Sequence, residues 1–192
     1  MKPFFSAYVV EPRALQRPRS AAPWIVTLRE KAGTAPVVRG SRAPIVLGDP
    51  GDGLALEIGE DTWGAPNRWM KEKGLDATAG LVAFAPVQHA PPGTPCLVPV
   101  TAFMSDDGRL LRDPNHSCLT LAALRWSVVS DNAAPQSGFC LLTLRVRVIA
   151  REEDAVLAIG EEHHDEWLDG WKTLADVQNC AAPVAGSTLV AD

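Results

Sequence analysis

The stretch that decides the fold class is residues 139–149, FCLLTLRVRVI. Its side chains alternate in character, with apolar residues on one face and polar residues on the other: Leu142, Leu144, Val146 and Val148 against Thr143, Arg145 and Arg147. A period of two is typical of a β-strand that packs one face on a core and turns the other to solvent. We therefore expect a long strand here, in a sheet that is mainly antiparallel.

Shorter strands are predicted on both sides of this stretch. β-Branched, aromatic or alternating residues, bounded by Gly and Pro, indicate strands over residues 4–10, 24–28, 45–47, 54–58, 81–87 and 96–104. Residues 105–108 predict a hairpin turn onto a strand at 109–111, and 66–73 reads as a short helix. Residues 119–129 suit a helix or a strand. With 16 prolines and 15 glycines in 192 residues, the composition argues against a helical bundle.

The periodicity changes to a helical one between residues 154 and 178. Apolar positions recur every three or four residues, while acidic residues crowd the opposite face; the stripe is Val156, Ile159, His163, Trp167, Trp171 and Leu174. Gly160 indicates that the regular helix begins near Glu161. The predicted fold class is thus α+β: a β-rich domain of mainly antiparallel strands with a C-terminal amphipathic helix packed on the sheet.

The length predicts one β-rich α+β domain over residues 1–179, with a basic Pro/Arg arm at 11–23 and a tail at 180–192. Charge is segregated along the chain. Residues 1–43 hold eight basic and two acidic residues, net +6, and the remainder holds 10 basic and 21 acidic residues, net −11. Either the basic segment packs near the acidic helix within one fold, or one of these surfaces meets a partner of opposite charge.

Cysteine usage and apolar runs bear on the compartment. The four cysteines form no C-x-x-C pair, so a zinc ribbon or a thioredoxin-like site is not indicated. The apolar N-terminal run is interrupted by Glu11 and Pro12, which makes it a poor signal peptide. No apolar run is long enough to span a bilayer. We expect a cytoplasmic protein with reduced thiols and no membrane contact.

Candidate metal ligands cluster in residues 161–166, EEHHDE. Glu161 and His164 stand three residues apart, which places both on one side of a helix, as in half of a di-iron E-x-x-H pair. The most plausible third ligand is His116. The competing interpretation packs His163 in the tryptophan stripe and leaves His164 on a solvated acidic face. No cofactor and no catalytic residue are predicted, since nucleophile and phosphate-loop motifs are missing.

Six tryptophans accompany a single tyrosine. Trp63 and Trp69 flank a short segment between turn signals and are the better interface candidates, together with Arg13, Arg17 and Arg19 of the arm. The leading hypothesis is a non-enzymatic cytoplasmic protein-interaction or assembly module, a subunit of a larger complex or a homo-oligomer. One alternative is a nucleic-acid-binding accessory protein that uses the basic N-terminal segment. Another is a metal-dependent enzyme that uses the His/Glu cluster near 161–164.

Overall fold

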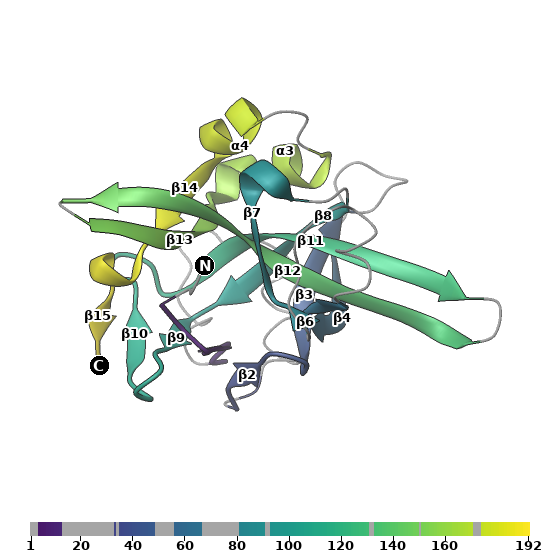
Figure 1. Cartoon of the computed structure of the whole chain (residues 1–192), viewed down its shortest axis with the longest axis horizontal. Helices are drawn as coiled ribbons and strands as arrows, with labels where there is room; N and C mark the ends of the chain where they lie inside the picture. Colours follow the sequence, from purple (N-terminus) through teal and green to yellow (C-terminus); the bar gives the residue numbers. More distant parts are fainter. Residues whose placement is uncertain are drawn as a thin grey trace.

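Most of the structured chain is β-strand, arranged as two large sheets and one small one (Figure 1). The structure is a computed structural model that describes residues 4–12, 33, 35–48, 56–66, 81–90, 93–130, 133–149, 151–170 and 174–192. The expected strand at 24–28, all but the first residue of the expected helix at 66–73, and most of the basic arm lie outside these residues. The β-rich α+β class is confirmed.

The strands are β1 (Ala7–Val9), β2 (Val37–Val38), β3 (Arg42–Gly48), β4 (Leu56–Trp63), β5 (Ala65–Pro66), β6 (Leu81–Val82), β7 (Phe84–Pro86), β8 (Thr94–Val100), β9 (Ala102–Met104), β10 (Leu110–Arg112), β11 (Leu119–Ser130), β12 (Ala133–Val148), β13 (Arg151–Ile159), β14 (Ala181–Val184) and β15 (Val190–Ala191). The helical segments are the 3₁₀ turns η2 (Val87–His89), η3 (Glu161–His163) and η4 (Gly186–Thr188), and the helices α3 (His164–Leu168) and α4 (Leu174–Cys180).

The largest sheet has the order β14-β13-β11-β8-β3-β4-β12-β7. Because β12 pairs with β11 as well as with β4, the pairings β11–β8–β3–β4–β12–β11 form a closed circuit. All pairs are antiparallel except those of β12 with β4 and with β7. A second sheet has the order β15-β10-β9-β1-β2. β11 and β12 form a long hairpin that extends from the body of the molecule (Figure 1).

The predicted strand at 139–149 is the second half of β12, and the ambiguous segment at 119–129 is the strand β11. The hairpin expected around 105–108 joins β9 to β10. The central residues of β11 and β12, 121–124 and 139–142, are buried without a break. Half-buried and exposed side chains alternate only from residue 144 onward in β12.

The prediction of one helix from Asp154 onward is wrong. Residues 151–159 form β13, and the helical part is divided between η3, α3 and α4. The last five residues of β13 are all buried, and residues 156–159 belong to the core, so side chains on both faces of the strand are covered. A continuous buried run satisfies a helical period as easily as a strand period, so the stripe at Val156 and Ile159 was not diagnostic.

Helix α3 packs against the sheet through Trp167. Its side chain is fully buried, and Nε1 donates a hydrogen bond to the carbonyl of Cys96 on β8, 3.0 Å away. The helix ends at Gly170, whose φ of 104° is a conformation that favours glycine. The short helix therefore fixes the segment that follows β13 onto β8.

Candidate functional site

A cavity of about 540 Å³ opens where four segments meet, and its volume lies in the range of ligand-binding sites. The β10–β11 loop, the start of β11, the β13–η3 junction and the C-terminal segment all contribute to it. The lining residues are Asp113, His116, Cys118, Leu119, Thr120, Ala158, Ile159, Gly160, Glu161, Glu162, Ala182, Pro183, Val184 and Thr188. We call this cavity the acid-lined pocket.

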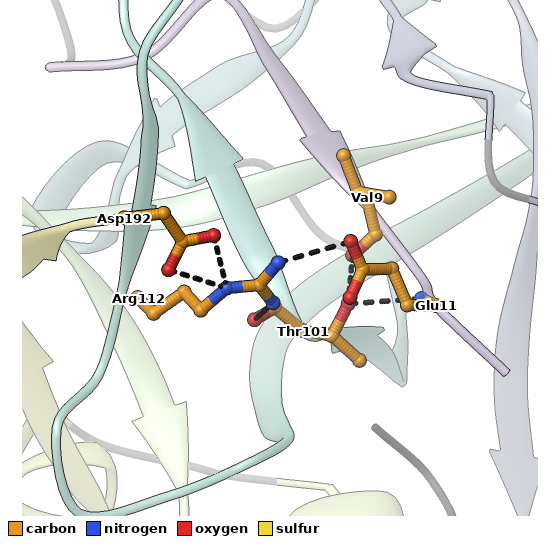
Figure 2. Close-up of polar contacts among 5 residues, drawn as sticks. All are labelled: Val9, Glu11, Thr101, Arg112 and Asp192. Carbon is orange, nitrogen blue, oxygen red and sulfur yellow. Dashed lines mark hydrogen bonds and ion pairs between the residues drawn. The ribbon is translucent and has the colours of Figure 1, made fainter. Parts of the chain in front are cut away.

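Arg112 anchors the loop that carries Asp113 and His116 (Figure 2). Its Nη2 donates to Glu11 at 3.0 Å, its Nε donates to the carboxylate of Asp192 at 2.7 Å, and its Nη1 donates to the carbonyl of Thr101 at 3.2 Å. One guanidinium thus joins the end of β1, the β8–β9 connection and the C-terminal residue. These contacts hold the beginning of the pocket loop at a fixed position.

The pocket loop itself is organised by the carboxylate of Asp113. Oδ1 accepts hydrogen bonds from the backbone N–H groups of Asn115 (2.8 Å) and His116 (2.9 Å), and it lies 2.9 Å from Nδ1 of the His116 ring. Partial burial raises the pKa of this carboxyl, but the hydrogen bonds outweigh that effect and hold the pKa below 3.8. Asp113 is therefore an anion at neutral pH.

Two further carboxylates come from the turn that follows β13. A Cβ atom at Gly160 would lie 2.5 Å from Oε1 of Glu162, so the Glu162 side chain folds back over the backbone of Gly160. Glu161 and Glu162 are both exposed. With Asp113 they give the pocket three carboxylates, and no Lys or Arg is among the lining residues that the structure describes.

The inner wall holds a buried hydrogen-bond network. Thr120 Oγ1 donates to the carbonyl of Ile159 at 2.7 Å, and the same oxygen lies 2.8 Å from Nε2 of His164. The hydroxyl of Thr120 thus links the ring of His164 to the last residue of β13. Burial lowers the pKa of His164 below 6.5, so this imidazole is neutral at pH 7.

The expected places of the two adjacent histidines are reversed. His164 is 4% exposed, whereas His163 is half-exposed and its Nδ1 lies 3.2 Å from Oε2 of Glu166. The helix α3 begins at His164, three residues after the expected start at Glu161, and it follows a 3₁₀ turn. The side chains are therefore rotated relative to the predicted helix.

The predicted metal ligands are only partly brought together. His116 and Glu161 line the pocket, but His164 faces Thr120 and is not a lining residue. Within the described part of the chain, no three His, Cys, Asp or Glu side chains are grouped closely enough to hold a metal ion.

Cys118 also lines the pocket, two residues after His116 in the sequence. Burial raises the pKa of its thiol to about 12, and its Sγ lies 3.7 Å from the carbonyl of Leu119. A thiol with this pKa is almost entirely protonated at neutral pH and is a poor nucleophile. The pocket therefore offers anionic and apolar surface for binding.

Of the predicted interface residues, only Trp63 lies in the described part of the chain; Arg13, Arg17, Arg19 and Trp69 are outside it. Trp63 is fully buried, and its Nε1 donates to the carbonyl of Ala83 at 3.1 Å. Its ring packs against Phe5, Tyr8 and Phe84. Trp63 therefore lies at the centre of the aromatic core and not at the surface, where an interface residue was expected.

The sequence reasoning missed Asp113 and Glu162 as pocket residues. The stretch Asp113-Pro114-Asn115 carried a usable signal, because Asp before Pro and Asn favours a turn in which the carboxylate caps the following N–H groups. No sequence signal placed the C-terminal segment opposite that loop. That arrangement depends on the pairing of β14 with β13, which joins residues 181–184 to 156–159.

No protein-family model matches this chain, and no curated protein matches it. Solved structures share its fold. A protein from Bordetella bronchiseptica aligns with a TM-score of 0.60 at 14% identity, covering 97% of this chain and 97% of that one. A Bacteroides thetaiotaomicron protein aligns with a TM-score of 0.60 at 13% identity, covering 98% and 90%. A phage-related protein from Bordetella bronchiseptica aligns with a TM-score of 0.57 at 16% identity, covering 98% and 92%.

At these identities the likeness shows the fold alone. Among the described segments, no helix has both the length and the apolar character needed to cross a bilayer.

Proposed function

We propose that this chain is a non-enzymatic cytoplasmic protein-interaction module, and that its acid-lined pocket receives a basic and apolar segment of a protein partner. The observation that carries the proposal is the pocket lining: Asp113, Glu161 and Glu162 stand around a wall that includes Leu119 and Ile159. Carboxylates suit a lysine or arginine head group, while the apolar wall suits its aliphatic stem or a neighbouring apolar side chain.

The state of the cysteines supports the cytoplasmic part of the proposal. Cys96, Cys118, Cys140 and Cys180 are all free thiols. Proteins of reducing compartments keep their thiols in this form.

The two alternatives have less support. Phosphate groups are repelled by a pocket with three carboxylates, so nucleic-acid binding would depend on the basic N-terminal segment. Arg13, Arg17 and Arg19 of that segment lie outside the described residues. Arg39 lies over the ring of Phe84, and Arg42 lies 3.7 Å from a carboxylate oxygen of Glu60. A metal-dependent enzyme would need His116, Glu161 and His164 to converge, and His164 points to Thr120 instead. Both alternatives remain predictions that rest on the sequence alone.

The test is fluorescence anisotropy with a labelled peptide of sequence Arg-Leu-Arg-Leu-Arg. We expect the full chain to bind it, with affinity falling as salt screens the pocket charges. Replacing both Glu161 and Glu162 by Gln should weaken binding at least about 10-fold. The matched control is Glu57→Gln, which removes one exposed carboxylate of β4 outside the pocket.

A labelled Glu-Leu-Glu-Leu-Glu peptide should not bind. Equal binding of the basic peptide by the pocket variant and by the Glu57 control would overturn the proposal, as would the absence of binding at low salt.

A further inference from the structure

We infer that the partner segment is the tip of the β12–β13 hairpin of a second copy of this chain, so that two copies exchange hairpin tips into each other's acid-lined pockets. This inference rests on the proposed function of the pocket, and it adds the identity of the partner. Its elements are an exposed apolar residue at the hairpin tip, two exposed arginines that flank that residue, and the position of tip and pocket on one side of the molecule.

The tip residue is Ile149, which follows the last residue of β12. Its side chain is 96% exposed and its φ is +56°. Left-handed backbone is unfavourable for a β-branched residue, and short hairpin turns normally use Gly or Asn at such positions. Val148 pairs with Arg151, so Ile149 lies in a two-residue turn that itself requires a positive φ. The full exposure of its apolar side chain is explained if Ile149 is buried in a partner.

Two exposed arginines flank the tip. Arg147 and Arg151 are exposed and stand two residues on either side of Ile149. The carboxylate of Glu152 lies 3.2 Å from Nε of Arg145, and Glu153 accepts a hydrogen bond from Ser187. Glu152 also stands opposite Arg147 in the register of the hairpin, but its carboxylate pairs with Arg145. Arg147 and Arg151 are therefore the charges beside the apolar apex that can meet the acid-lined pocket.

The tip cannot enter the pocket of its own chain. Strand β13 runs directly from Arg151, beside the tip, to Ile159 in the pocket wall. Eight residues of extended strand separate the two by about 26 Å. An occupied pocket therefore needs a tip from another molecule.

The layout favours a reciprocal pair over an open chain of copies. In Figure 1 the hairpin tip, β10 and the C-terminal segment all lie in the left part of the view, and the contact of Ser187 with Glu153 joins η4 to β13. Tip and pocket on one side allow a two-fold arrangement, in which each tip fills the pocket of the other copy and no site is left over.

The experiment is sedimentation velocity on the full chain over a concentration series, with two charge-reversed variants. One carries Arg147→Glu with Arg151→Glu and therefore has an acidic tip and an acidic pocket. The other carries Glu161→Lys with Glu162→Lys and has a basic tip and a basic pocket. The parent chain should dimerise, and each variant alone should weaken dimerisation at least about 10-fold. An equimolar mixture of the two variants should dimerise again, since both contacts become complementary.

A further variant, Ile149→Asn, should also weaken the dimer while its circular dichroism spectrum stays unchanged. Its matched control is Val38→Asn, which removes an apolar side chain that is 49% exposed on β2 and should leave the dimer intact.

A monomeric parent chain that still binds the Arg-Leu-Arg-Leu-Arg peptide would overturn the exchange of tips and leave the proposed function standing. A dimer that persists in both charge variants and in Ile149→Asn would place the interface elsewhere and would equally overturn this inference. A mixture of the two charge variants that stays monomeric would contradict the pairing of tip with pocket.

Discussion

Nε2 of His164 lies 2.8 Å from Oγ1 of Thr120, at the inner wall of the acid-lined pocket. The contact joins the first turn of α3 to the start of β11, two segments that lie 44 residues apart in the sequence. Because Thr120 also donates to the carbonyl of Ile159, the pocket wall and the helix behind it are fixed by the same hydroxyl. The neutral form of the imidazole is part of this arrangement.

Stability should therefore depend on pH through His164. Burial lowers the pKa of His164 below 6.5 in the folded chain, against the effect of its hydrogen bond to Ile159 and of the nearby acids Glu161, Asp165 and Glu162. Below pH 6.5 the unfolded chain binds a proton that the folded chain resists, so the free energy of unfolding should fall as the pH is lowered. Urea titrations between pH 7.5 and 5 measure this slope.

The variant His164→Gln isolates the contribution of His164, and it should show a smaller slope over the same range. The matched control is His116→Gln, which removes an exposed ring. Asp113, whose pKa is lowered below 3.8, holds its stabilising contribution above that value and loses it only in more acidic solution. If the free energy of unfolding changed equally with pH in His164→Gln and in the parent chain, the role of His164 in the pocket wall would be contradicted.

The ion pair of Asp61 and Arg125 should stabilise the sheet circuit. Arg125 Nε lies 2.7 Å from Oδ2 of Asp61, which is 3% exposed and also accepts from Ser137. Asp61→Asn should lower the free energy of unfolding by about 2 kcal/mol, because a hydrogen-bonded charge is left without its partner. Glu60→Gln, which alters the exposed contact with Arg42, should change it by less than about 0.5 kcal/mol. Equal effects in urea titrations would contradict this ranking.

The four thiols should be slow to react in the native protein. Burial raises the pKa of Cys96, Cys118, Cys140 and Cys180, so the thiolate fraction at pH 8 is small. A chromogenic disulfide reagent should label the native chain slowly and all four cysteines rapidly in guanidinium. Rapid labelling of Cys118 in the native chain would contradict the protonated thiol described at the pocket.

The conformation of Ile149 predicts a stabilising substitution. Ile149→Asn should raise the free energy of unfolding of the monomer by about 1 kcal/mol, since asparagine tolerates left-handed backbone better than a β-branched residue. The measurement is a urea titration at a protein concentration low enough to exclude association, because a dimer adds stability that depends on concentration. An unchanged or lower free energy would show that the turn carries no strain.

The sequence predicted the β-rich architecture because alternation at Leu142, Leu144 and Val146 is a local property of one strand. The helix predicted from Asp154 is wrong for a non-local reason. Other segments cover both faces of β13 at residues 155–159, so no face of the strand is left polar. The burial of Trp63 has a similarly non-local cause. Its ring contacts Phe5, Tyr8 and Phe84, which lie in other segments of the chain.

Only part of the candidate site could be predicted from the sequence. His116 and Glu161 were identified from residue type, and both line the pocket. Their meeting depends on the antiparallel pairing of β11 with β13, in which Leu121 stands opposite Ala158. The register of two distant strands is set by tertiary packing, and a single sequence does not specify it.

The most direct measurement of the central claim is a titration of the ¹⁵N-labelled chain with the Arg-Leu-Arg-Leu-Arg peptide, followed by amide chemical shifts. We predict saturable shifts concentrated in residues 113–120, 158–162 and 182–188, with the Glu161→Gln/Glu162→Gln variant losing them. Saturable shifts centred on another surface, or none at peptide concentrations that saturate the anisotropy signal, would contradict the assignment of the acid-lined pocket as the binding site.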